Sequence, residues 1–160
     1  MAREIVPGPA VSTEAIRPRL LCDEMLLRLA RWLRAAGYDT ALAVSGMQDR
    51  AVFRQVVAEE RYLITRDRGF LERRDAERWV VLLETQALDD QARLLRERLG
   101  INWLRAPFSR CLVCNCRLHT VLGRQGDLRY CCRCQKLYWE GSHVRRMRCR
   151  LKQWQLCPLS

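Results

Sequence analysis

The stretch RLLCDEMLLRLARWLRAAGYD, residues 19–39, changes its hydrophobic period once. Residues 19–22 form a short apolar run, typical of a buried strand, that runs out at Asp23. Apolar residues then recur on one helical face until Gly37 provides a stop: Leu26, Leu29, Ala30 and Leu33. A second short strand fits residues 38–43. The stretch therefore predicts a strand–helix–strand unit.

The same alternation continues along the chain. Asp49 is expected to cap a helix with an apolar face, residues 62–65 to form a buried strand that runs out at Asp67, and residues 79–83 to form another strand. Asp89 or Asp90 opens a last helix that ends at Gly100. Strands that alternate with helices predict an α/β domain, a three-layer α/β/α arrangement with a parallel sheet covered on both faces.

Three acids fall where this topology places ligand sites. Asp23 and Asp67 each follow a predicted strand, and Asp49 begins the helix between those strands. Ligands of open α/β sheets bind at the carboxyl ends of the strands, near a topological switch point. Converging carboxylates repel one another unless a cation lies between them, and oxygen ligands favour Mg²⁺ or Mn²⁺. The alternative is that all three acids are only helix caps.

Cysteines form a second candidate site. Cys111, Cys114, Cys131 and Cys134 make two Cys-x-x-Cys pairs separated by sixteen residues, the spacing of a zinc ribbon. Cys116, Cys132, His119 and His143 are alternative ligands. We expect structural zinc on the two symmetrical pairs.

The start of the chain and its nine cysteines indicate a compartment. The first twenty residues contain three prolines and no continuous apolar run, so we expect no secretory signal, and no later segment approaches the length of a membrane span. We therefore expect a cytoplasmic protein without a membrane partner, because cysteine clusters in a reducing compartment bind metal rather than form disulfides.

Positive charge is concentrated near the C-terminus. Residues 109–160 hold eleven Lys or Arg against two acids, which accounts for nine of the eleven net positive charges. This density predicts a polyanionic partner, with counterion release contributing to affinity. Basic residues interleaved with aromatic ones suit single-stranded RNA. The candidate RNA-binding residues are Tyr138, Trp139, His143, Arg145, Arg146 and Arg148. Tyr138 and Trp139 are alternatively core residues of the ribbon, and His143 a core histidine or a spare zinc ligand.

The chain resembles the Mut-seven C-terminal RNase domain family, a group of PIN-like nucleases. The resemblance covers roughly residues 19–148 and rests on a set of short motifs: LCDEML at 21–26, LARWLR at 29–34, GYD at 37–39, ITRD at 64–67, SRCLVCN at 109–115, and YWEGSH at 138–143 with Arg146-Met147 after it. It implies a PIN-like α/β domain fused to a zinc ribbon, and a ribonuclease that leaves a 5′-phosphate and a 3′-hydroxyl. The acids of such a site map onto Asp23, Asp49 and Asp67.

The resemblance also divides the chain and exposes one departure. It implies a flexible tail at 1–18, a PIN-like nuclease domain at 19–104, and a zinc ribbon with a basic C-terminal tail at 105–160. PIN-like nucleases usually gather about four acids, and the fourth is open here between Asp39, Asp75, Glu84 and Asp89, because Gln48 stands where another acid is expected.

The predicted chemistry is metal-dependent hydrolysis of RNA. One or two Mg²⁺ or Mn²⁺ ions on the three acids activate a water and neutralise the scissile phosphate. A two-histidine ribonuclease is disfavoured because His119 and His143 both lie in the ribbon segment, and a phosphate-binding Gly-x-x-x-x-Gly-Lys loop is absent from the sequence. Two other classes stay open: a catalytically weak RNA- or ribosome-binding module, and a toxin-like partner of an antitoxin.

Overall fold

The computed structural model describes residues 17–123 and 126–159. Most of the predicted N-terminal tail, residues 1–16, lies outside these residues. The elements follow one another in the order β1 (Arg19–Cys22), η1 (Glu24–Leu26), α1 (Leu27–Ala35), β2 (Thr40–Leu42), α2 (Asp49–Ala58), β3 (Arg61–Thr65), η2 (Arg68–Glu72), α3 (Ala76–Trp79), β4 (Val80–Leu82), α4 (Leu88–Leu99), β5 (His119–Gly123), β6 (Gly126–Cys131), β7 (Lys136–Tyr138) and α5 (Ser142–Leu156).

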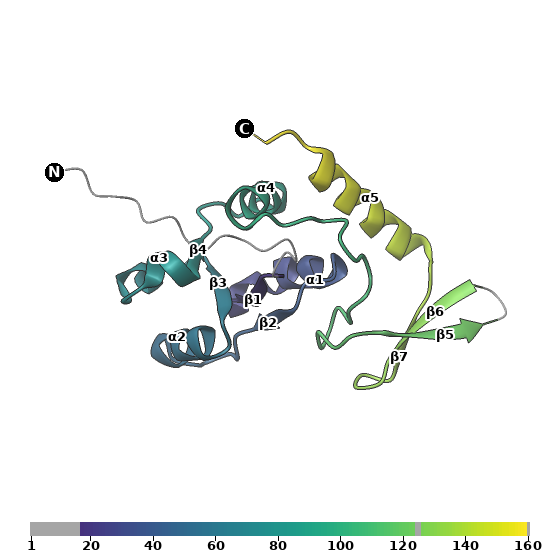
Figure 1. Cartoon of the computed structure of the whole chain (residues 1–160), viewed down its shortest axis with the longest axis horizontal. Coiled ribbons are helices and arrows are strands. Elements are labelled where there is room, and N and C mark those ends of the chain that lie inside the picture. Colours follow the sequence, from purple (N-terminus) through teal and green to yellow (C-terminus); the bar gives the residue numbers. More distant parts are fainter. Residues whose placement is uncertain (1–16, 124–125, 160) are drawn as a thin grey trace.

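The first four strands form one parallel sheet in the order β2-β1-β3-β4. Helices cover both faces of this sheet, α1 and α4 on one side and α2 on the other (Figure 1). The predicted three-layer α/β/α arrangement is therefore confirmed. Because β2 and β3 pair with opposite edges of β1, the chain changes direction at β1 and creates a switch point there.

Side-chain alternation along the strands builds two hydrophobic cores. Leu20 and Cys22 face the core under α1 and α4, whereas Leu21 faces the core under α2. Strands with both faces buried carry near-continuous apolar runs, which is the pattern that the sequence shows at 20–22 and 62–65. Gly37, at φ +96°, ends α1, and Gly100, at φ +63°, ends α4, as the sequence predicted.

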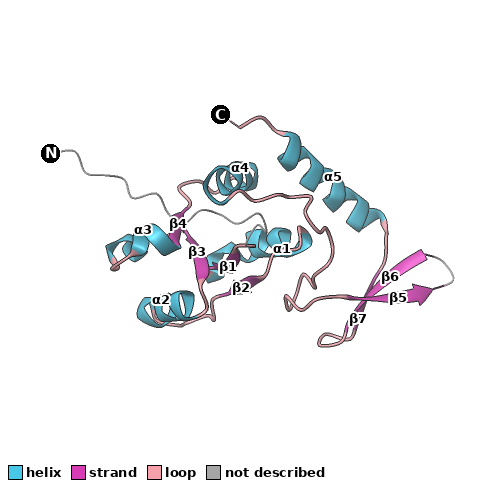
Figure 2. Ribbon diagram, viewed as in Figure 1, coloured by secondary structure: helices cyan, strands magenta, loops and turns pink. Residues whose placement is uncertain are grey.

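The ribbon is a separate antiparallel sheet in the order β5-β6-β7, and α5 follows it (Figure 2). The segment expected to be a basic tail is thus largely helical. Three apolar residues of α5 are buried in the core under α1 and α4: Met147, Leu151 and Trp154. Trp154 contacts the rings of Trp32 and Trp103, each with a centroid distance of 4.8 Å. The helix that carries the basic residues is therefore fixed to the α/β domain.

Candidate functional site

The acidic edge of the sheet is organised by a threonine. Asp23 and Asp67 follow β1 and β3, which are adjacent parallel strands, so the prediction that these two strand ends are neighbours is confirmed. The buried Thr65 hydroxyl donates a hydrogen bond to Asp23 Oδ2 at 3.0 Å and accepts one from the Asp67 amide at 3.0 Å. This one side chain ties the two acidic strand ends together.

Each of the two acids keeps oxygen atoms for a ligand. Asp23 is half-buried and makes no cap hydrogen bond to its helix, although it occupies the cap position of η1. Asp67 does cap η2, because its Oδ1 accepts from the Gly69 amide at 2.8 Å, but its side chain is exposed. Carboxylate oxygens are hard ligands suited to Mg²⁺ or Mn²⁺. The donor set therefore fits a divalent cation.

Asp49 stands apart from this pair. The structure makes it the first residue of α2 with Gln48 at the cap position, so the prediction that Asp49 is the cap is wrong by one residue. The reason is that Gln48 has extended backbone angles while Asp49 has already entered the helix. Within residues 17–123 and 126–159, the oxygen atoms of the three acids do not form a close cluster. The sulfur atoms of four cysteines, described below, do form one.

An open hollow of about 470 Å³ lies beside Asp23. It is lined by residues that follow β1 and by residues at the end of β2: Glu24, Met25, Leu42, Ala43 and Ser45. Met25 is 67 % exposed, so apolar surface adjoins the acids. This edge of the sheet has room for a substrate.

The structure separates the candidates for a fourth acid. Glu84 comes after β4 at the same carboxyl edge, because the amide of Leu83 just before it donates to the Thr65 carbonyl. Its carboxylate pairs with Arg68 at 2.7 Å. Asp89 instead accepts hydrogen bonds from Arg150 and Trp154, and Asp75 lies at the start of α3. Of these three acids, Glu84 is the one that lies just past the carboxyl end of a strand, two residues after β4 ends at Leu82.

Asp39 lies at the opposite, amino edge, because it precedes β2. Its carboxylate accepts from Arg61 at 2.9 Å and from the Asn115 side chain at 2.7 Å. Burial raises the pKa of Asp39, but these hydrogen bonds and the charge of Arg61 outweigh it and bring the pKa to about 2. Asp39 therefore holds the two parts of the chain together and does not belong to the acidic edge.

The second site is the predicted set of four cysteines. The Sγ atoms of Cys111, Cys114, Cys131 and Cys134 all lie within 4.8 Å of one another. Cys111 and Cys134 are 3.9 Å apart, and Cys114 and Cys131 are 3.4 Å apart. Four sulfurs around a zinc ion at about 2.3 Å would be roughly 3.8 Å apart in a regular tetrahedron. The cluster therefore has the composition and size to hold zinc.

The alternative zinc ligands lie outside this cluster. His119 Nε2 is 4.0 Å from Cys132 Sγ, and neither belongs to the set of four. Tyr138, expected either to stack on RNA or to pack in the ribbon, places its hydroxyl 3.1 Å from Cys111 Sγ. Burial raises the pKa of Cys111, yet hydrogen bonds from Tyr138 and from two backbone amides lower it to about 6. Tyr138 thus favours the thiolate that a metal requires.

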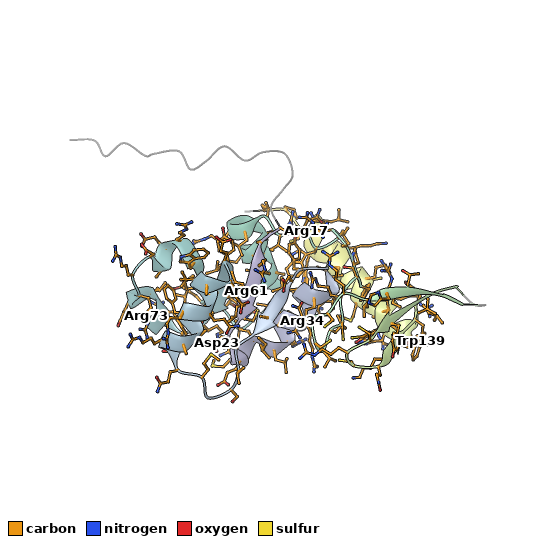
Figure 3. All side chains as sticks on the ribbon, turned by 60° about the horizontal axis from the view of Figure 1, so that its bottom comes forward. Arg17, Asp23, Arg34, Arg61, Arg73 and Trp139 are labelled. Carbon is orange, nitrogen blue, oxygen red and sulfur yellow. The ribbon has the colours of Figure 1, made fainter. Side chains whose placement is uncertain are left out.

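The first cysteine loop is clasped by the α/β domain. Arg34 of α1, 4 % exposed, donates to the carbonyls of Leu112 and Val113 at 3.0 and 2.9 Å, and to Thr40 at 2.9 Å. Asn115, at φ +68°, accepts from the Thr40 amide at 3.0 Å. The edge strand β2 is therefore covered by the cysteine loop. Figure 3 shows Arg34 between Asp23 on the α/β side and Trp139 in the ribbon.

The predicted RNA-binding residues lie on β7, the turn after it and α5. Trp139 is 63 % exposed, and His143, Arg145 and Arg146 are also exposed. Arg148 is half-buried and pairs with Glu140 at 3.1 Å. In the view of Figure 3, Trp139 lies on the other side of Arg34 from Asp23.

Three residues that support the two sites had no predicted functional role: Thr65, Arg34 and Asn115. Thr65 has a local signal, because a hydroxyl two residues before Asp67 can bond its backbone amide. Arg34 carries no such signal, since its partners lie 78 and 79 residues away.

Fold and site together define a class: a parallel α/β domain with acids at its strand ends, joined to a ribbon with a four-cysteine cluster of the size to hold a metal ion. The chain belongs to the Mut7-C RNAse domain family, whose model matches residues 18–151. It is 28 % identical over 147 residues to the human protein named "Exonuclease mut-7 homolog", covering 89 % of this chain and 16 % of that protein. The chain thus spans about a sixth of that relative's length. The search of solved structures found no match. The family assignment confirms the predicted resemblance and indicates a nuclease-type domain. Among the described residues, no helix is long and apolar enough to span a membrane.

Proposed function

We propose that this chain is a metal-dependent ribonuclease that hydrolyses RNA phosphodiester bonds at the carboxyl edge of its parallel sheet. The observation that carries the proposal is the Thr65 hydroxyl, which joins Asp23 and Asp67 at the switch point between β1 and β3. If Asp23 and Asp67 served only as helix caps, a buried hydroxyl bonded to both residues would not be needed. Family membership supports the nuclease class.

The acids have distinct parts in this proposal. Asp23 and Asp67 hold Mg²⁺ or Mn²⁺, Asp49 adds a carboxylate from the first turn of α2, and Glu84 is our candidate for the fourth acid. The bound ion supplies an activated water and neutralises charge on the scissile phosphate. Thr65 fixes the orientation of the Asp23 carboxylate, and the hollow lined by Met25 and Leu42 accommodates the neighbouring nucleotide. A general base from the protein is not needed for this chemistry.

The ribbon and α5 supply affinity for single-stranded RNA. The residues proposed for this are Trp139, Tyr138, His143, Arg145, Arg146 and Arg148. Tyr138 acts here mainly through Cys111, because its hydroxyl contacts that sulfur. The support is the excess of positive charge in residues 109–160 and the exposure of Trp139. The cytoplasmic location and the division at residues 104 and 105 stay predictions.

Cleavage of a labelled mixed-sequence single-stranded RNA by the zinc-loaded chain tests the proposal. Wild type is compared with the Asp23→Asn/Asp67→Asn double variant, with and without Mn²⁺ or Mg²⁺. The Asp75→Asn/Asp90→Asn double variant is the matched control, because it removes the same two charges from surface acids outside the edge. We expect metal-dependent cutting by wild type and control that disappears in the first variant. Equal cutting by all three proteins contradicts the site. RNA binding by wild type without cutting favours the RNA-binding module instead.

A further inference from the structure

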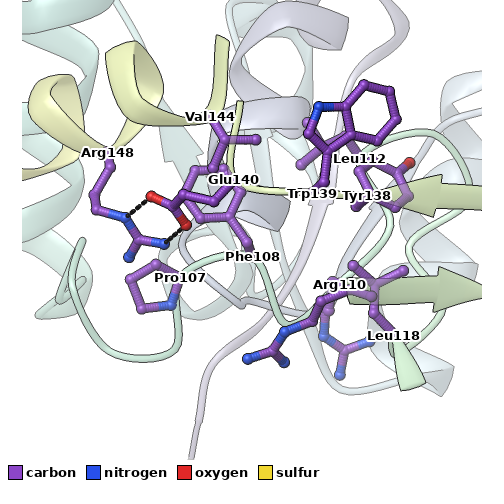
Figure 4. Close-up of a pocket in the computed structure, with 11 residues that line it drawn as sticks. Pro107, Phe108, Arg110, Leu112, Leu118, Tyr138, Trp139, Glu140, Val144 and Arg148 are labelled. Atoms are coloured by element: carbon purple, nitrogen blue, oxygen red, sulfur yellow. Dashed lines mark hydrogen bonds and ion pairs between the residues drawn. The ribbon is translucent and has the colours of Figure 1, made fainter. Parts of the chain in front are cut away.

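Two hollows adjoin one another where the ribbon meets the α/β domain. The first, of about 170 Å³, is lined by side chains of the linker, the ribbon and α5, among them Phe108, Arg110, Arg129, Trp139 and Arg148. Figure 4 shows the Arg148–Glu140 ion pair on one side of this pocket and Arg110 with Leu118 on another. The second hollow, of about 190 Å³, also contains Arg110 and Leu118. Arg110 therefore stands between the two.

The second hollow concentrates positive charge. Arg17, Arg110 and Arg117 line it together with Ser109. Burial lowers the pKa of Arg110, and the neighbouring charges of Arg117, Arg61 and Arg17 lower it further against the opposing effect of Asp39. Asp39 is already engaged by Arg61 and Asn115. Guanidinium groups gathered in this way repel one another, and an anion such as a phosphate between them relieves the repulsion.

The first hollow is suited to a flat, uncharged ring. Trp139 is 63 % exposed beside it, so its ring is open to stacking. One face of the Phe108 ring is covered by Arg148, whose Cζ lies 5.1 Å from the ring centroid. Among the residues that line this hollow, the one carboxylate is that of Glu140, and its charge is paired with Arg148. A volume of about 170 Å³ is below the roughly 300–1,000 Å³ of pockets for drug-sized ligands, which favours one ring system of a longer polymer.

Rigid contacts hold both hollows in place. The Arg110 guanidinium donates to the carbonyls of Asn115 at 2.9 Å and Gly37 at 3.4 Å. A Cβ at Gly37 would lie 2.5 Å from the Ala106 carbonyl oxygen and 2.9 Å from Ser109 Oγ, so a glycine is needed for this close approach. Phe108 adopts φ +58°, and its amide donates to the Ala35 carbonyl at 2.7 Å. Arg110 and the backbone around Gly37 and Phe108 are therefore held in position before any ligand arrives.

We infer that the two hollows form a binding site for one nucleotide of single-stranded RNA, with its base stacked on Trp139 in the first hollow and its phosphate between Arg17, Arg110 and Arg117 in the second. The inference rests on the proposed function for the class of polymer. It adds a defined subsite, distinct from the acidic edge, that anchors the strand at the ribbon junction. An acidic protein segment would satisfy the arginines but would leave the Trp139 ring without a stacking partner.

The test measures RNA binding in the absence of cleavage. The zinc-loaded full chain carrying Asp23→Asn/Asp67→Asn is titrated, without Mg²⁺ or Mn²⁺, into a fluorescein-labelled oligouridylate about 12 nucleotides long, within the range of single-strand site sizes. Trp139→Ala and Arg117→Gln are added separately. Leu137→Ala on β7 and Arg98→Gln on α4 are the matched controls, because both side chains are exposed and line neither hollow.

We expect Trp139→Ala to weaken binding roughly 5- to 150-fold, the effect of losing one base stack. Trp139→Phe, which keeps a ring, should recover most of the affinity even if the alanine variant folds poorly. Arg117→Gln should reduce the salt dependence, lowering the slope of log K against log salt by about 0.7 for one lost phosphate contact. Both controls should bind like the parent protein.

Affinities of Trp139→Ala and Arg117→Gln equal to those of the controls overturn the inference. Equal competition by polyglutamate, an acidic polymer without bases, overturns it as well and identifies an acidic protein partner instead. Because the assay omits catalysis, its result is independent of whether the acidic edge cleaves RNA. If the cleavage experiment fails, the proposed nucleotide subsite is therefore still tested by the binding measurement alone.

Discussion

In the cysteine cluster all four sulfur atoms lie within 4.8 Å of one another, whereas at the acidic edge the Thr65 hydroxyl bonds the Asp23 carboxylate and the Asp67 amide, and Asp49 stands exposed. Cys111 and Cys114 lie on a loop that is held to the α/β domain by Arg34 and by its own Asn115, and Cys131 and Cys134 lie at the end of β6 and the turn after it. Asp23 and Asp67 follow strand ends, and an open hollow lies beside Asp23. Closed four-ligand sites are typical of structural zinc, and open sites leave room for substrate. The difference predicts that losing a ligand affects folding at the first site and chemistry at the second.

The largest expected effect is that of Cys114→Ser. Structural zinc contributes on the order of 10 kcal/mol to folding of a small domain, so a cluster with three thiolates should lose its zinc and unfold the ribbon. Elemental analysis should show zinc falling from one equivalent to near zero, while hydrogen exchange rises in β5, β6 and β7. Protection of α5 should persist, because Met147, Leu151 and Trp154 pack in the main core.

Cys132→Ser is the control for that experiment. Cys132 neighbours a predicted ligand but is exposed and lies outside the set of four. Retained zinc in Cys114→Ser, or equal zinc loss in both variants, would show that the cluster does not hold the metal as four thiolates.

Arg34→Met tests the clasp between the two regions. The side chain donates to three carbonyls while almost completely buried, and methionine leaves those carbonyls without donors. We expect the free energy of unfolding to fall by about 3 kcal/mol in urea denaturation. Arg31→Met on the exposed face of the same helix should change it little. Equal stability of the two variants would mean that the loop and the α/β domain are energetically independent.

Asp39→Asn tests the same junction through pH. The folded pKa of Asp39, about 2, is below the ordinary value of 3.8, so its contribution is fully present above pH 4 and is lost as pH falls toward 2. The shift corresponds to about 2 kcal/mol of stability at pH 7. Denaturation midpoints between pH 2 and 7 should be lower and less pH-dependent for Asp39→Asn than for wild type. If Asp39→Asn keeps the wild-type dependence of stability on pH, the contact that is lost in acid does not involve Asp39. Asp75→Asn, which changes an exposed acid, is the control.

These junction contacts mark the limit of what the sequence reveals. The hydrophobic period of residues 19–39 predicts the strand, the helix and its glycine stop, because those features depend on neighbours a few residues apart. Each Cys-x-x-Cys pair is local in the same way, and the two pairs together predict the four-cysteine cluster. Asp39 and Asn115 are 76 residues apart, and their hydrogen bond arises only when the ribbon loop packs against β2. Local patterns contain no information about that packing, so Asp39 remained a candidate acid in the sequence and became a junction residue in the structure.

The acidic edge shows the same limit at shorter range. The prediction that the strand ends before Asp23 and Asp67 are adjacent is correct, because β1 and β3 pair in parallel although β2 lies between them in the sequence. The basic segment at 145–152 was expected to be a tail, because its charge conceals the apolar face of α5 that Met147, Leu151 and Trp154 form. The role of Thr65 was also not predicted, because threonine is a common residue in β-strands. Its importance lies in the direction of its hydroxyl.

The smallest predicted effect is that of Thr65→Val, which removes this hydroxyl and keeps the shape of the side chain. Asp23 loses one hydrogen-bond donor, and the Asp67 amide loses an acceptor. We expect RNA cleavage at saturating Mn²⁺ to fall about 10-fold, equivalent to about 1.4 kcal/mol, and the Mn²⁺ concentration for half-maximal rate to rise. Thr65→Ser, which retains the hydroxyl, should recover most of the rate. If both variants cleave alike at every Mn²⁺ concentration, the hydroxyl does not position the acids. A loss of stability without a change in Mn²⁺ dependence would show that Thr65 supports the fold alone. The cysteine cluster would then still be a preformed site, but the acidic edge would no longer be a site positioned by Thr65.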